Sequence, residues 1–190
     1  MMMNKSHSMG YWQSTIPAAA TIAPATQFDI RVAGWRDFGA LATLQKKIVR
    51  EAEHLAATGK DRKEPLLYAL AKAILHRKRV HTIVAEEEGK FVGYITIVFG
   101  KFQRVRETAY IVVGVLASHR GRGIGTQLLS RAEDHARDRG MHRVELEVFE
   151  TNDSAVRLYE KLGYVIEGRR REAVRTDEGY TDIIWMGKLL

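Results

Sequence analysis

A strand-like apolar run leads straight into a loop of glycine and arginine, and this junction limits the possible folds more than any other feature of the sequence. The run YIVVGVLA covers residues 110–117, and the loop HRGRGIG covers residues 119–125. Glycine lets backbone amides approach a ligand closely, and arginine donates charge-assisted hydrogen bonds. An amphipathic stretch follows, and the start of a helix favours a bound anion. We therefore expect a strand, a phosphate-binding loop and a helix, in that order.

The composition is that of a globular domain, and it excludes several kinds of catalytic and metal site. The chain has 190 residues, of which 45% are hydrophobic and 28% charged, and it contains no cysteine. Disulfides, a thiol nucleophile and cysteine-ligated zinc are therefore excluded, and a cytoplasmic location is expected. The seven histidines lack metal-ligand spacing, so no metal is expected. The longest apolar run is far shorter than the roughly 20 residues that cross a bilayer, so we expect no membrane span.

The formal net charge of +7 favours an anionic partner. Nucleic acid is one candidate, because the stretch RRREAVR at residues 169–175 is strongly basic. No zinc finger or stacking-aromatic motif accompanies it, and arginines that alternate on a hairpin usually face solvent. We therefore expect no specific nucleic-acid complex, and a phosphorylated cofactor explains the charge better.

The chain divides into a tail at residues 1–27, rich in small residues, and a single domain at residues 28–190. Hydrophobic periodicity predicts an α/β pattern within the domain. The expected strands cover residues 28–33, a hairpin at 81–100 with its turn at 88–90, 107–115, 142–149, and two C-terminal strands around a turn at 177–179. The expected helices open near Asp37 and at Pro65, follow the glycine loop with Leu128, Leu129, Ala132 and Ala136 buried, and cover residues 154–163.

Two motifs in this order resemble the GNAT superfamily of N-acetyltransferases. The first is Arg120-Gly121-Arg122-Gly123-Ile124-Gly125, which fits the family's acyl-CoA pattern of Arg or Gln, two residues, Gly, one residue, and Gly or Ala. The second is NDSAVRLYEKLGY, residues 152–164, with a Leu-Tyr pair and a Gly-aromatic pair. A P-loop and a Rossmann site are disfavoured, because the glycine spacing fits neither. The resemblance implies a GNAT fold, with a mixed, mostly antiparallel sheet, helices on both faces and splayed strands that form the acyl-CoA cleft.

The resemblance also implies acetyl-CoA as the cosubstrate and assigns residues to it. The implied cofactor-binding residues are Val113, Gly114, Val115, Arg120, Gly121, Arg122, Gly123, Ile124, Gly125, Thr126, Asn152 and Tyr159. The amide of Val115 would polarise the thioester carbonyl, and Tyr159 would protonate the leaving thiolate. Each of these residues has an alternative, purely structural role. Val115 would then only pair in a sheet, Asn152 would cap a helix, and Tyr159 would pack in the core.

A general base is also expected, because an amine with a pKa near 10.4 is almost fully protonated at neutral pH. Many family members carry a glutamate six residues before the Val115 position, but this chain has Ala109 there. Glu107 and Glu147 are our first candidates. Strand alternation places Glu107 on the same face of its strand as Ala109, and Glu147 lies on the neighbouring strand. Further candidates are Glu145, which shares a face with Glu147, and Glu51 and Glu53 in the first helix.

The resemblance implies direct transfer of an acetyl group from acetyl-CoA to a primary amine. The expected acceptor is a small molecule such as a polyamine or an antibiotic, or alternatively a protein N-terminus, as in ribosomal-protein acetyltransferases. A catalytically silent CoA-binding sensor would need the loop but neither the base nor Tyr159. Assembly as a homodimer stays open.

Overall fold

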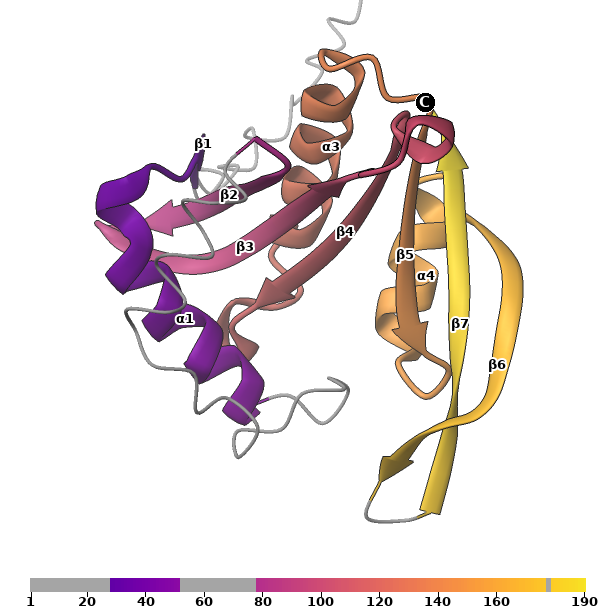
Figure 1. The fold of residues 1–190 in the computed structure, drawn as a ribbon. Coiled ribbons are helices and arrows are strands. Elements are labelled where there is room, and N and C mark those ends of the chain that lie inside the picture. The colour runs from indigo at the N-terminus through magenta and orange to yellow at the C-terminus, as the bar shows by residue number, and fades with distance from the viewer. Residues whose placement is uncertain (1–27, 52–77, 177–178) are drawn as a thin grey trace, which may run out of the picture.

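The computed structural model describes residues 28–51, 78–176 and 179–190, and its strands form one mixed sheet (Figure 1). The strand order is β1-β2-β3-β4-β5-β7-β6. The strands are β1 (Asp29–Val32), β2 (Val80–Glu87), β3 (Lys90–Phe99), β4 (Thr108–Val115), β5 (Arg143–Phe149), β6 (Val165–Thr176) and β7 (Gly179–Leu189). The helices are α1 (Phe38–Glu51), α3 (Ile124–Arg137) and α4 (Asp153–Lys161), with 3-10 turns at Trp35–Asp37, Gln103–Val105 and Ala117–His119. Within these residues, no helix is long and apolar enough to span a membrane.

The predicted elements that fall in the described residues are present, with small shifts at their ends. The expected tail at residues 1–27 and the helix at Pro65 lie outside the described residues, as does most of the turn at 177–179. The hairpin turn is shorter than expected, because only Glu88 and Gly89 separate β2 from β3. Both have positive φ, 51° and 75°, as a two-residue turn between twisted strands requires.

β4 and β5 are parallel neighbours, but they pair over a short distance only. The register joins Thr108 to Arg143, Ala109 to Val144 and Tyr110 to Glu145, and the pairing ends there. β4 continues beside β3 as far as the pair of Gly93 and Val115. Figure 1 shows the two halves of the sheet diverging beyond this vertex. The predicted splayed strands and the mixed, mostly antiparallel sheet are confirmed.

Helices cover both faces of the sheet, as predicted (Figure 1). A Cβ on Gly93 would lie 3.1 Å from Ile124 of α3, whereas a Cβ on Gly114 would lie 3.2 Å from Ile48 of α1. Gly114 pairs with Tyr94, the residue after Gly93, and successive residues of a strand point to opposite faces. α1 and α3 therefore pack on opposite faces of β3 and β4, and glycine lets each approach closely.

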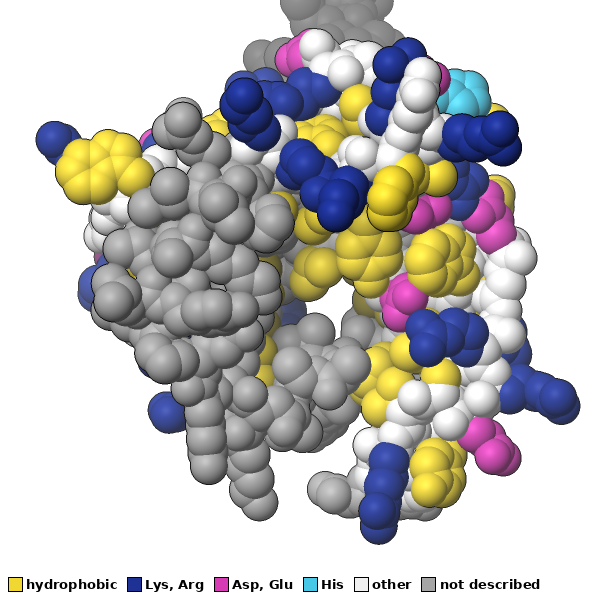
Figure 2. Space-filling view, viewed as in Figure 1, with side chains coloured by type: hydrophobic (Ala, Val, Ile, Leu, Met, Phe, Trp, Pro, Cys, Tyr) yellow, Lys and Arg dark blue, Asp and Glu magenta, His cyan; other side chains and the backbone are white. Residues whose placement is uncertain are grey.

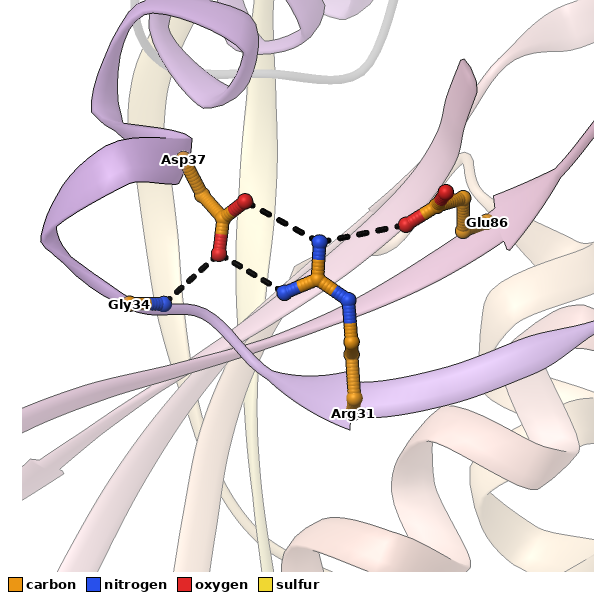
Figure 3. Close-up of polar contacts among 4 residues, drawn as sticks. All are labelled: Arg31, Gly34, Asp37 and Glu86. Atoms are coloured by element: carbon orange, nitrogen blue, oxygen red, sulfur yellow. Dashed lines mark hydrogen bonds and ion pairs between the residues drawn. The ribbon is translucent and has the colours of Figure 1, made fainter. Parts of the chain in front are cut away.

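The entrance to α1 is fixed by the ion-pair network around Arg31 in β1 (Figure 3). Its guanidinium donates to Asp37 at 2.7 and 3.0 Å and to Glu86 of β2 at 3.1 Å. Asp37 also accepts a hydrogen bond from the backbone N–H of Gly34 at 2.7 Å. Hydrogen bonds from Arg31 and then Gly34 hold the pKa of Asp37 below its usual value. The predicted helix start near Asp37 is confirmed, although a 3-10 turn precedes α1.

The core lies largely between α3 and the sheet. The four residues predicted to be buried on this helix, Leu128, Leu129, Ala132 and Ala136, are at most 1% exposed. Burial of these side chains fixes α3, and so the loop before it, against β2, β3 and β4.

Leu128→Ala should destabilise the fold by about 2 to 5 kcal/mol, because it leaves a cavity at a fully buried position. The matched control is Leu189→Ala, since Leu189 is 63% exposed and its truncation should change stability by no more than about 0.5 kcal/mol. Urea unfolding of both variants measures the difference. Equal losses would show that burial of Leu128 between α3 and the sheet does not stabilise the fold.

Candidate active site

A cleft of about 850 Å³ lies at the end of β4, beside the glycine loop and the first turn of α4. The predicted cofactor residues that line it are Val113, Gly114, Val115, Arg120, Gly121, Gly123, Ile124, Gly125, Thr126, Asn152 and Tyr159. Arg122 is the one member of the predicted set that does not line the cleft. The structure therefore brings together residues more than 40 positions apart in the sequence.

The glycine loop exposes backbone at the positive end of α3. Gly121 and Gly123 have φ of 74° and 79°, and no atom lies within 4 Å of a Cβ built on either. Gly123 is the N-cap of α3, whose first turn carries no acidic side chain to neutralise the helix dipole. Free N–H groups at such an end bind phosphate well. Gly125 has another role, because its missing Cβ makes room for Leu158 of α4 at 3.2 Å.

The two arginines of the loop have different roles. Arg120 lines the cleft, and its Nε donates to the carbonyl oxygen of Val115 at 3.3 Å. Arg122 instead donates to both carboxylate oxygens of Glu87, at 2.6 and 3.2 Å, and its guanidinium lies 4.9 Å from the centre of the Phe28 ring. Arg122 therefore contacts Glu87 and Phe28 and does not line the cleft, and its expected contact with the cofactor stays a prediction.

Glu87 anchors the loop to the end of β2. Besides Arg122, it contacts Nε2 of His119 at 3.0 Å. The hydrogen bonds from Arg122 are the main reason that the pKa of Glu87 is lowered. Sequence reasoning missed this residue, because no local motif links it to a loop more than 30 positions away.

The edge of β4 supplies the wall of the cleft. Leu116 donates its N–H to Val92 of β3 at 3.0 Å, and backbone groups alternate in direction along a strand. The N–H of Val115 therefore points away from β3, toward the gap that the diverging β5 leaves. This is the orientation that an amide needs to bind the carbonyl oxygen of a ligand in the cleft.

Tyr159 packs in the core and also lines the cleft. It is only 6% exposed and packs edge-on against Tyr164, with 5.9 Å between the ring centres, yet it also lines the cleft. Burial raises its pKa well above the usual value, with a smaller contribution from Tyr110. The hydroxyl therefore stays protonated across the physiological pH range.

Asn152 likewise caps α4 and lines the cleft. Its Oδ1 accepts hydrogen bonds from the backbone N–H of Ala155 at 3.2 Å and from Oγ of Ser154 at 3.1 Å. Both contacts use the same oxygen, so capping does not engage the side-chain amide nitrogen.

The glutamates considered as the general base lie at different places relative to the cleft. Neither Glu107, which forms an ion pair with Arg106 at 3.5 Å, nor Glu147, which pairs with Arg170 at 3.3 Å, lines the cleft. Glu51 does line it, and its carboxylate accepts a hydrogen bond from the N–H of Ala117 at 3.1 Å.

The two remaining candidates lie elsewhere or outside the described part of the chain. Glu145 is paired with Arg143 at 3.2 Å, and Glu53 lies outside the described residues. Within the described ranges, no group of three or more His, Asp or Glu side chains is arranged to hold a metal ion.

Comparison with known proteins identifies the family to which this chain belongs. The sequence model of the family described as "Acetyltransferase (GNAT) family" matches residues 46–164, more than half of the chain. This chain belongs to the GNAT acetyltransferase family. The match includes the glycine loop, the edge of β4 and the whole of α4, which are the parts that build the cleft.

Relatives within the GNAT family agree in sequence and in structure. L-amino acid N-acyltransferase MnaT of Escherichia coli is 32% identical over 107 residues, 55% of this chain and 61% of the relative, so the chain spans about three fifths of that protein. The crystal structure of a GNAT-family acetyltransferase from Streptococcus pneumoniae matches with a TM-score of 0.80 and 26% identity, covering 86% of this chain and 100% of that one. A putative acetyltransferase from Salmonella typhimurium, solved with its cofactor acetyl-CoA, matches with a TM-score of 0.75 and 25% identity, covering 86% and 94%.

Gly123→Val should abolish most acetyl-CoA binding, because the branched side chain would project into the cleft beside the loop amides. Gly140→Val is the matched control: Gly140 has φ of 72°, is equally open around its Cβ position, and does not line the cleft. Both glycines have a similar positive φ, so valine strains the backbone at each position and the main difference is the position relative to the cleft. Calorimetric titration should show a large loss of affinity in the first variant alone. An equal affinity in the two folded variants would exclude the loop as the cofactor site.

Proposed function

We propose that this protein is an acetyl-CoA-dependent N-acetyltransferase that acts on a primary amine of a small molecule. The observation that carries the proposal is the divergence of β4 from β5 beside an anion-binding loop, which leaves a wall of free backbone groups next to a site for a pyrophosphate. The pyrophosphate would lie on the amides of residues 121–126, and the pantetheine arm would follow Val113, Gly114 and Val115.

The proposed reaction is a direct transfer without a covalent enzyme intermediate. The neutral amine attacks the thioester carbonyl, a C–N bond forms and the C–S bond breaks. The Val115 amide stabilises charge on the carbonyl oxygen, and such donors are worth about 3 kcal/mol in other enzymes. Tyr159 gives its proton to the thiolate. Counted from the protonated amine, the acceptor loses two protons. The first goes to water before attack, and the second restores Tyr159 afterwards.

The first proton must leave before attack, which costs roughly 4.6 kcal/mol at pH 7 for an amine with a pKa of about 10.4. Of the candidate bases in the described residues, Glu51 is the one that lines the cleft, so we favour it as the group that receives this proton through water. Glu147 is the second candidate, from the opposite side of the gap. Glu107 is less well placed, because it is turned toward Arg106 at the N-terminal side of β4.

The proposed acceptor class is supported by the relatives. The name of the Escherichia coli relative supports a small-molecule acceptor, and an amino acid is one such amine. A protein N-terminus is the alternative acceptor.

Two other functions give different results in the same assays. A silent CoA-binding sensor would bind acetyl-CoA without turnover. A nucleic-acid-binding protein would form a specific complex that survives 200 mM salt. We infer a cytoplasmic location from the absence of cysteine.

Tyr159→Phe should bind acetyl-CoA normally but lower kcat at least about a hundredfold, because it removes only the hydroxyl that donates the proton. Tyr164→Phe is the matched control, since this neighbouring buried tyrosine does not line the cleft. Thiol release under single-turnover conditions, with polyamine, aminoglycoside, amino-acid and N-terminal-peptide acceptors, measures the effect. A parental rate in Tyr159→Phe, with chemistry limiting, would show that another group protonates the thiolate. No release with any acceptor would favour the sensor.

A further inference from the structure

The glycine loop before α3 needs contacts from elsewhere in the fold to hold its shape. Its middle residue lies between Gly121 and Gly123, and both glycines have positive φ, 74° and 79°. Glycine has more backbone freedom than any other residue, so the loop sequence does not fix its own conformation. Burial of Ile124, which is 1% exposed, fixes the end of the loop that enters α3. The conformation of residues 119–123 therefore depends on what their side chains contact.

One carboxylate holds the loop at two points. Glu87, the last residue of β2, accepts hydrogen bonds from both Nη atoms of Arg122 at 3.2 and 2.6 Å, and it contacts Nε2 of His119 at 3.0 Å. A bidentate pair fixes the orientation of the guanidinium as well as its position. The guanidinium also lies over the ring of Phe28, which is 8% exposed. The loop is thereby tied to β2, a strand that is paired on both sides.

The pair of Glu87 and Arg122 lies outside the cleft that the loop borders. Gly121, Gly123 and His119 line the cleft, whereas neither member of the pair does. A ligand in the cleft would therefore depend on Glu87 through the conformation of the loop rather than through a contact with its carboxylate.

The charge of Glu87 is unfavourable for an anion in the cleft. Hydrogen bonds from Arg122 lower the pKa of Glu87, so this carboxylate is ionised at neutral pH. It lies beside a loop proposed to bind a pyrophosphate, and like charges repel. On the side of the molecule that Figure 2 shows, Lys and Arg side chains gather at the end where β3 joins β4, whereas the glycine loop follows the opposite end of β4. Attraction between charges therefore does not explain a carboxylate at this position.

We propose that Glu87 is a positioning residue for acetyl-CoA. Through Arg122 and His119 it holds the loop so that the amides of residues 121–126 face the pyrophosphate of the cosubstrate. The gain from aligned donors exceeds the repulsion between the carboxylate and the phosphates. This inference rests on the proposed acetyl-CoA site and names a residue outside the cleft on which the affinity of that site depends.

Glu87→Gln tests the proposal, because geometry and charge predict opposite results. The substitution removes the negative charge and weakens the contacts to Arg122 at nearly constant side-chain size. The Kd of acetyl-CoA in calorimetric titration should rise about threefold to thirtyfold, between the value of an exposed ion pair and that of a charge-assisted hydrogen bond. Loss of repulsion alone would lower the Kd. The matched control is Glu88→Gln, which removes the same charge in the exposed turn between β2 and β3 and should not raise the Kd.

The link through Arg122 is tested with Arg122→Gln and with the double variant. If both residues act through one contact, the double variant should bind acetyl-CoA no more weakly than the weaker-binding single variant. Additive losses would show that Arg122 serves the cofactor independently of Glu87 and would contradict the proposed link.

A truncated donor separates positioning from a general loss of structure. S-acetylpantetheine has the thioester and the pantetheine arm but no pyrophosphate, so its kcat/KM should be equal in Glu87→Gln and the parental protein. With acetyl-CoA, KM should rise and kcat should stay unchanged. A partly unfolded variant would lose kcat/KM with both donors equally, and that result would contradict the proposal.

The two proposals fail in different ways. If Gly123→Val and Gly140→Val bind acetyl-CoA equally well, the proposed cofactor site is wrong. If Gly123→Val alone loses affinity, but Glu87→Gln binds acetyl-CoA as tightly as the parental protein or more tightly, the site is correct and Glu87 does not position it. In a protein without turnover the calorimetric comparison decides, because it needs no acceptor.

Discussion

The short pairing of β4 with β5 is the constraint on which the rest of the structure depends. Three residue pairs hold the two halves of the sheet together, and beyond Tyr110 the backbone of β4 has β3 as its partner on one side only. Unpaired backbone groups inside a protein are costly, so such an edge is stable only if a ligand or water satisfies it. The divergence thus turns the middle of a sheet into a binding surface. The glycine loop that follows β4 gives that surface a positive end.

Much of this arrangement could be predicted from the sequence, because it depends on local patterns. Three of these patterns are contiguous in the sequence: the apolar run of β4, the glycines after it and the periodicity of α3. Each has a direct physical explanation. Tyr159 and Asn152 were found through a second local motif. The structure shows why packing does not exclude a catalytic role for Tyr159: a side chain can be almost fully buried and still line a cleft.

Other features of the site depend on pairing between distant segments and were not predictable in this way. The sequence did not show that Glu87, at the end of a different strand, binds the guanidinium of Arg122. Strand alternation gave Glu107 and Glu147 a face but not a partner, and their arginine neighbours decide where each carboxylate points.

The central claim is that a CoA molecule binds along the free edge of β4 with its pyrophosphate on the glycine loop. Titration of the isotopically labelled protein with CoA, followed through backbone amide NMR signals, tests it most directly. The largest shift changes should fall on the amides of residues 113–115 and 121–126, with α4 next and β1 unaffected. Saturable binding with these amides unchanged, and the shifts concentrated on another part of the sheet, would contradict the account.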